Sequence, residues 1–205
     1  MSDSKSSSDS DSPPTYSQKR RIVCQVYVSK FKDMDNARNI ILRSGTFPYY
    51  VNESKRAEQG DSKERNEIRV IVGVDSDSRE YTNLAGNVNR KGETILEGVI
   101  RECSEESLGL LTLSRDRLLS SVTVYSSLQV IVFYKVSEEE AKTLLSTFKV
   151  KVKKVERSEL SDLDDISWSD FWNIIAKNNE TERMFRPIAM TLEDVEGLKE
   201  ELVKS

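Results

Sequence analysis

Apolar and polar positions predict strands over much of the chain from residue 22 onward. Several short segments are rich in β-branched and aromatic residues and are bounded by polar turns, which is typical of strands. One of them, "FKVKVKKV", alternates apolar and basic residues as a half-buried strand would. The polar turn "DSDS" between two of the runs predicts a hairpin. The predicted strands are 22–28, 68–74, 80–86, 121–125, 128–136 and 148–155.

Helical signals lie between these runs. Ser137 followed by Glu140 is a capping box, and it predicts a helix over 138–148. The other predicted helices are 33–45 (ended by Gly45), 93–107, 168–176 and 191–203, the last with a Thr191/Asp194 box. Strands come in neighbouring pairs with helices between them, so we expect a mixed β-sheet packed between helices, in the α/β or α+β class.

Two polar segments interrupt or precede this pattern. Residues 1–18 are rich in Ser and Asp and contain Pro13-Pro14, so they cannot bury enough apolar surface to fold. We expect a disordered tail there and a single domain over residues 19–205. The charged segment 51–67 is predicted to be a long exposed loop.

Composition narrows the chemistry and the compartment. The chain contains no histidine, which removes histidine-based catalysis and most zinc sites. Its two cysteines, Cys24 and Cys103, lie in apolar patterns and predict buried thiols in a reducing, cytoplasmic compartment. No apolar run reaches the roughly 18 residues of a membrane span, so no membrane association is expected. The net charge of -4 gives no general footprint for nucleic acid.

The predicted helix 93–107 separates an apolar arc from an acidic one. At about 100° per residue, Leu96, Val99, Ile100 and Cys103 share the arc that should face the core. The acidic arc beside it contains Glu102, Glu105 and Glu106. Like charges at this spacing repel one another, and a divalent cation bound by their oxygens would reverse that effect. The acidic arc therefore indicates a metal site more than a solvated face.

Residues 86–110 resemble the box motif of the Nudix hydrolase family. Glu93 is followed by seven residues and then by "RECSEE" (101–106), which agrees with the centre of that motif position by position. The flanks depart from it. Asn87 stands where the box has glycine, and Gly109 comes one residue late, with Leu108 in its place. We expect Asn87 to turn with a positive φ, and the helix to extend by one residue to a Gly109 cap.

The resemblance implies a fold, a cofactor and a set of roles. It implies a mixed sheet sandwiched between helices, and Mg²⁺ or Mn²⁺ bound by Glu102, Glu105 and Glu106, with a backbone carbonyl of Gly86 or Asn87. Glu93 and Arg101 would form a structural ion pair. The implied activity is hydrolysis of a diphosphate linkage by attack of water on phosphorus.

A further acid is implied shortly before a late tryptophan, here Trp168. Glu159 is the residue type most often used in the family, and Asp162 better matches the spacing, so both remain candidates as catalytic residues. A merely solvated acidic loop is an equal alternative.

The substrate stays open. The leading hypothesis is a nucleoside diphosphate-linked small molecule or a capped RNA end. The alternatives are a diphosphoinositol polyphosphate and a non-catalytic Nudix-like binding or regulatory module. Tyr49, Tyr50 and Tyr81 could stack on a base, although core positions suit them better. The basic run "KVKVKK" (149–154) could meet phosphates of RNA or inositol, although a solvated strand face explains it better. The oligomeric state is not predicted.

Overall fold

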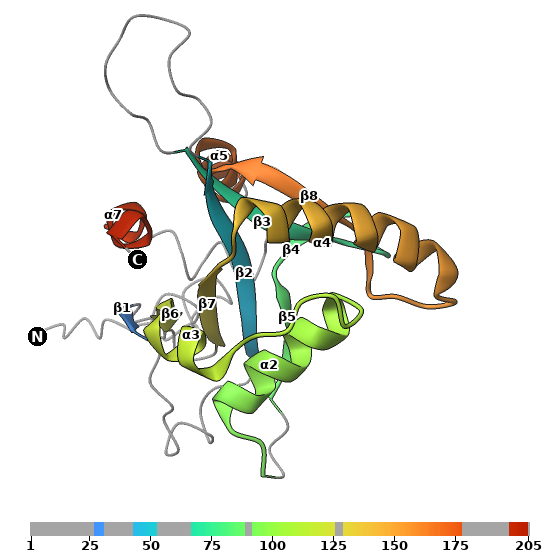
Figure 1. The fold of residues 1–205 in the computed structure, drawn as a ribbon, viewed down its shortest axis with the longest axis horizontal. Helices are drawn as coiled ribbons and strands as arrows, with labels where there is room; N and C mark the ends of the chain where they lie inside the picture. The colour runs from blue at the N-terminus through green and yellow to red at the C-terminus, as the bar shows by residue number, and fades with distance from the viewer. Residues whose placement is uncertain are drawn as a thin grey trace, which may run out of the picture.

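The computed structural model describes residues 27–30, 43–52, 67–88, 92–125, 129–177 and 197–204. Within these ranges, eight strands form one mixed sheet (Figure 1). The strands are β1 (Tyr27–Lys30), β2 (Arg43–Asn52), β3 (Glu67–Asp75), β4 (Tyr81–Thr82), β5 (Leu84–Asn87), β6 (Val122–Tyr125), β7 (Gln129–Lys135) and β8 (Leu160–Ser167). The helices are α2 (Ile95–Glu106), α3 (Arg115–Ser120), α4 (Glu138–Lys151), the short 3₁₀ helix η2 (Val152–Lys154), α5 (Trp168–Lys177) and α7 (Leu198–Lys204).

The sheet runs in the order β1-β6-β7-β2-β3-β4, with β5 paired to β2 and β8 paired to β3. Strands β2 and β7 are parallel, with Arg43 opposite Gln129, and every other pairing among the described strands is antiparallel. One edge of β2 is divided between two partners. Its first half pairs with β5 and its second half pairs with β3. This division brings β5 beside β2 just where α2 packs on both strands.

Helices cover both faces of the sheet. Successive residues of β7 alternate between two cores, since Val132 and Tyr134 join one core and Phe133 joins the other. Residues of α2 and α4 pack in the first core, and residues of α5 and α7 pack in the second (Figure 1). A strand buried on both faces is apolar along its whole length, which explains the continuous run "VIVFY" in β7. The predicted fold class, a mixed sheet between helices, is confirmed.

Most predicted elements are present with shifted ends. The hairpin across "DSDS" is formed by β3 with β4, and the predicted pair of β6 with β7 is present and antiparallel. Helix α4 begins with the predicted box of Ser137 and Glu140. The predicted helix 93–107 is shorter at both ends, because α2 runs from Ile95 to Glu106.

The prediction that a helix ends at Gly45 is wrong, because β2 begins at Arg43. Gly45 serves a close strand contact instead. A Cβ added there would lie 2.1 Å from the Cβ of Ala85 on β5, so only glycine allows the two strands to approach this closely. The rest of that predicted helix lies outside the described residues.

The predicted strand 148–155 is also wrong, because α4 continues to Lys151 and is followed by η2. Ala141, Leu144 and Phe148 are buried at helical spacing, and this face carries the helix past the start of the alternating segment. Lysines in the last turn also suit the negative end of the helix dipole. The short alternating pattern is outweighed by a helix that is already formed.

Several predictions concern residues outside the described ranges. These are the tail 1–18, most of the first strand, the inner part of the 51–67 loop, and the Thr191/Asp194 start of the last helix. Val51, Asn52 and Glu67, at the ends of that predicted loop, belong to strands β2 and β3. In the described part of the chain, no helix is both long enough and apolar enough to cross a membrane.

Candidate functional site

Helix α2 is fixed at its start by a capping box that the sequence reasoning missed. The side chain of Thr94 accepts a hydrogen bond from the backbone N–H of Glu97 at 3.1 Å, and the Glu97 carboxylate accepts one from the Thr94 N–H at 2.8 Å. The pattern Thr-x-x-Glu before an apolar run was a usable signal. From this start, Leu96, Val99 and Cys103 enter the core as predicted, and Ile100 is half-buried.

Two of the predicted acids on α2 are buried. Glu102 is 7% exposed and Glu106 is 8% exposed, whereas Glu105 is exposed. Strand β5 covers Glu102, since a Cβ added to Gly86 would lie 2.1 Å from its Oε2. Gly86 therefore leaves room for this carboxylate beside the sheet.

Glu106 is the most perturbed carboxyl of the site. Its Oε2 is buried and has no hydrogen-bond partner among the described residues. Burial raises the pKa of Glu106 from 4.5 to about 8, helped by the neighbouring carboxyls of Glu159 and Glu102. Arg43, at the start of β2, acts weakly in the opposite direction on this pKa. No local signal pointed to Arg43, which the sequence pattern placed in a helix. We call Glu102, Glu106 and Glu159 the carboxylate group.

Arg101 joins the box residues to one another. Its guanidinium donates to Glu93 at 2.7 Å, to Glu102 at 2.6 Å and to Glu105 at 2.9 Å. It also donates to the backbone carbonyl of Asn87 at 2.9 Å, which ties the end of β5 to the helix. Hydrogen bonds to Glu93 and Glu102 raise the pKa of Arg101 further above its ordinary value. Burial raises the pKa of Glu102 even though Arg101 acts to lower it.

The two candidate outer acids have different neighbours. Glu159 immediately precedes β8, is exposed, and raises the pKa of Glu106. Asp162 lies within β8 opposite Val74, and its Oδ1 accepts a hydrogen bond from the N–H of Leu163 at 2.9 Å. Of these two candidates, only Glu159 is among the residues that shift the pKa values of Glu102 and Glu106.

The flanks of the box do not behave as expected. Asn87 ends β5, and it is not among the residues with positive φ in the described ranges. Helix α2 ends at Glu106 without the expected extension, and Leu108 and Gly109 then both adopt positive φ, +56° and +74°. Leu108 therefore takes the left-handed conformation at the slot where the box has glycine, a position that costs a non-glycine residue roughly 1–2 kcal/mol.

The three tyrosines considered for base stacking are held within the fold. Tyr49 and Tyr50 are 1% and 4% exposed. The hydroxyl of Tyr50 donates to Asp165 at 2.7 Å, and that of Tyr81 donates to Asp164 at 3.0 Å. These contacts support the core interpretation of all three.

The donor set suits a hard divalent cation in its chemistry. Buried carboxylates, one with an unpartnered oxygen, lie beside a further acid, and Mg²⁺ and Mn²⁺ prefer such oxygen ligands. The side chains are not gathered into a finished cage, because no group of three or more Asp, Glu or Cys in the described ranges is arranged to hold a metal ion. Arg101 instead engages Glu102 and Glu105.

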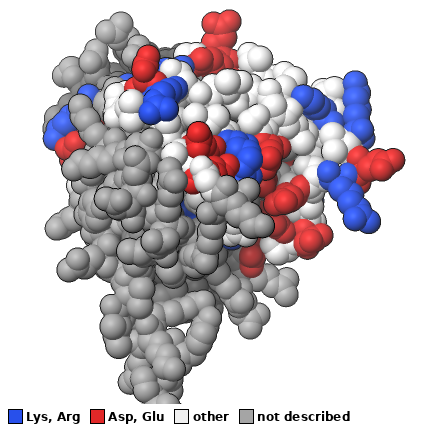
Figure 2. Space-filling model, turned by 90° about the horizontal axis from the view of Figure 1, so that it is seen from below, with Lys and Arg blue, Asp and Glu red and all other residues white. Residues whose placement is uncertain are grey.

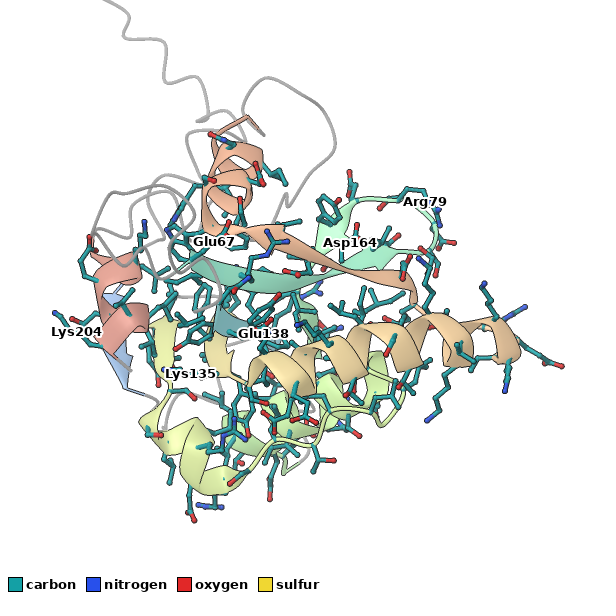
Figure 3. All side chains as sticks on the ribbon, turned by 45° about the horizontal axis from the view of Figure 1, so that its top comes forward. Glu67, Arg79, Lys135, Glu138, Asp164 and Lys204 are labelled. Atoms are coloured by element: carbon teal, nitrogen blue, oxygen red, sulfur yellow. The ribbon has the colours of Figure 1, made fainter. Side chains whose placement is uncertain are left out.

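Figure 2 shows acidic side chains gathered around a basic one on the face that includes α2. Because Arg101 already donates to Glu102 and Glu105, an added divalent ion would have to share these two acids with it.

Among the comparisons with known proteins, only the one with solved structures finds matches. No family model matches the chain, and no curated protein matches it. Among solved structures, it is similar to the crystal structure of a mutT/nudix family protein from Listeria innocua, with a TM-score of 0.42 and 11% identity over 80% of this chain and 96% of that chain. The resemblance to the Nudix family therefore rests on residues 86–110.

Proposed function

We propose that the protein is a metal-dependent hydrolase that cleaves a diphosphate linkage in a nucleoside diphosphate-linked substrate, by attack of water on phosphorus. The observation that carries the proposal is the buried, unpartnered carboxylate oxygen of Glu106 next to Glu159 and Glu102. A buried carboxyl without a partner lowers stability, and such groups are common where a ligand is bound.

Glu102 and Glu106 would hold Mg²⁺ or Mn²⁺, with Glu105 at the exposed rim and the backbone of Gly86 beside Glu102. A bound divalent cation would neutralise the diphosphate and lower the pKa of a bound water. Glu102 and Glu106 come from one helical face and are held by packing, so their separation is set before any ligand arrives.

The remaining residues orient the site. Arg101 anchors Glu93 and the end of β5, and this anchoring supports a positioning role. Glu159 is our candidate for the carboxylate that accepts a proton from the attacking water, because it lies close enough to Glu106 to raise the pKa of that carboxyl. Asp162 lacks a comparable contact with the acids of α2.

The test combines metal binding with a substrate panel. Calorimetry should detect binding of Mg²⁺ or Mn²⁺, and the panel should contain dNTPs, dinucleoside polyphosphates, NADH, nucleotide sugars, diphosphoinositols and capped RNA. Glu106→Gln should lose metal binding and hydrolysis, while Glu139→Gln, an exposed acid on α4, should keep both. Full turnover by the Glu106→Gln variant would contradict the proposed site.

The same panel separates the alternatives. Turnover confined to diphosphoinositols would assign the second hypothesis. Metal binding without hydrolysis of any compound would assign a binding or regulatory module.

A further inference from the structure

The segment that links α4 to β8 concentrates basic side chains. Residues 149–157 contain five Lys or Arg (Lys149, Lys151, Lys153, Lys154 and Arg157) and a single acid, in a chain whose net charge is -4. Figure 1 shows this segment at the far end of α4, where the chain turns back into β8. Figure 2 shows basic side chains at the same edge of the molecule.

An open cleft of about 1050 Å³ lies between this segment and the turn that follows β3. Its lining includes Lys153, Arg157 and Glu159. Because Glu159 lines the cleft and lies close enough to Glu106 to raise the pKa of that carboxyl, the cleft adjoins the carboxylate group of the proposed active site. A ligand in the cleft could therefore reach both the basic segment and the acids.

Main-chain contacts hold one wall of the cleft. The N–H of Ser76 donates to the carbonyl of Glu159 at 2.8 Å, and the Ser76 hydroxyl donates to the carbonyl of Ser158 at 2.7 Å. On the other wall, η2 ends with a bond from the N–H of Val155 to the carbonyl of Val152 at 3.2 Å. The backbone that presents the charged side chains is thus set by secondary structure.

The basic residues of the cleft have no acidic partner. Within the described ranges, neither Lys153 nor Arg157 forms an ion pair or a side-chain hydrogen bond, whereas Lys151 donates to the carbonyl of Leu108 at 2.5 Å. Two cations are left available, although acids line the same cleft.

The acidic residues that line the cleft restrict the ligands that it can bind. The Oδ1 of Asp75 is already occupied by the N–H groups of Asp77 and Ser78, at 3.0 and 2.7 Å. Asp77 and Glu156 also line the cleft, so its charge is mixed. A mixed lining disfavours a bare anion and suits a phosphate chain that is partly neutralised by a divalent cation.

We propose that Lys153 and Arg157 bind a phosphate group of the substrate that lies outside the scissile diphosphate. This inference rests on the proposed function and narrows its substrate class to compounds with at least one further phosphate. The phosphate can belong to a small-molecule polyphosphate chain or to the 5′ end of an RNA. Arg157 can form paired hydrogen bonds with phosphate oxygens, and Lys153 supplies a point charge.

Binding is tested first, independently of hydrolysis. Calorimetry with inorganic tripolyphosphate and Mg²⁺ compares the wild type with Lys153→Gln/Arg157→Gln and with Lys199→Gln/Lys204→Gln, a matched pair on α7 at the other end of the molecule (Figure 1). Loss of the charged hydrogen bonds should weaken binding about tenfold or more in the first variant only. Orthophosphate should bind more weakly than tripolyphosphate. Absence of tripolyphosphate binding to the wild type, or equal binding by both variants, would overturn the inference.

Hydrolysis then distinguishes the phosphate sources. For Lys153→Gln/Arg157→Gln, kcat/KM should fall about tenfold for dinucleoside tetraphosphates or for RNA with a 5′-triphosphate, and stay unchanged for a nucleotide sugar. The compound whose kcat/KM falls identifies the source. If no compound is hydrolysed but tripolyphosphate binding depends on the two residues, the proposed function fails and the phosphate site stands. If the wild type hydrolyses its substrates and both variants behave like it, the proposed function stands and the phosphate site fails.

Discussion

At the scale of single residues, the two candidate outer acids differ in what surrounds them. Glu159 raises the pKa of Glu106, whereas the Asp162 carboxylate accepts a hydrogen bond from the neighbouring backbone N–H of Leu163 in β8. We predict that Glu159→Gln lowers kcat about a hundredfold with little change in KM, the effect expected of a residue that acts in proton transfer. Asp162→Asn should keep kcat within a few fold. Steady-state kinetics at saturating Mg²⁺ measures kcat for both variants. A severe loss of kcat only in Asp162→Asn would reverse the assignment.

Gly86 on strand β5 leaves the space that the Glu102 carboxylate of helix α2 occupies. A Cβ at Gly86 would overlap the free end of the Glu102 side chain, which can move, and it would meet no backbone at that distance. We predict that Gly86→Ala displaces the Glu102 carboxylate and weakens Mg²⁺ binding about tenfold, while the midpoint of thermal unfolding changes by only a few degrees. Gly98→Ala on α2, where the nearest atom would be Ser44 Oγ at 3.0 Å, is the control. Unchanged Mg²⁺ affinity in Gly86→Ala would show that Glu102 does not bind the ion.

The start of α2 offers a second test at the scale of elements. Thr94 satisfies the N–H of Glu97, and no other side chain is seen to replace it in the described structure. Thr94→Ala should cost about 1 kcal/mol of unfolding free energy, which lowers the unfolding midpoint by roughly 2–4 °C. Denaturant unfolding measures the cost. A similar loss in Ser137→Ala, the equivalent cap of α4, would show that the two boxes contribute alike.

For the whole molecule, the raised pKa of Glu106 makes stability depend on pH. Its pKa is 4.5 as an ordinary carboxyl and about 8 in the fold, so between these values the folded state holds more protons than the unfolded state. Stability without metal should therefore be highest near pH 5 and fall towards pH 8, by at most about 1.4 kcal/mol per pH unit. Burial raises the pKa of Glu102 as well, which adds an effect of the same sign.

The change in stability between pH 5 and 8 is easier to assign because the chain has no histidine, which would titrate in the same range. Unfolding in EDTA from pH 5 to 8 gives the measurement, and Glu106→Gln should flatten the profile. The lowered pKa values of Asp75 and Glu140 act in the opposite direction, but only at more acidic pH. Stability that rises from pH 5 to 8 in the wild type would contradict the burial of a protonated Glu106.

Local patterns predicted those elements whose own residues decide them. Helix α4 starts at Ser137 because its box and its apolar spacing agree, and α2 buries Leu96, Val99 and Cys103 because a helix must turn one arc to the core. The prediction of a strand at 148–155 was wrong because the alternating pattern is short and the preceding helix extends into it. The prediction of a helix that ends at Gly45 was wrong because residues from Arg43 onward pair with strands β5 and β7.

The sequence by itself determined the fold class, the helix that carries Glu102, Glu105 and Glu106, and the spacing that makes them resemble a Nudix box, since all of these depend on residues close together in the chain. Only the tertiary structure decided which acids are buried, that Arg43 and Glu159 stand near Glu106, and that Lys153 and Arg157 face a cleft beside them. The reason is physical. Burial and the pKa of a carboxyl are set by whatever packs against it, and here those neighbours come from strands β2, β5 and the approach to β8, far apart along the chain.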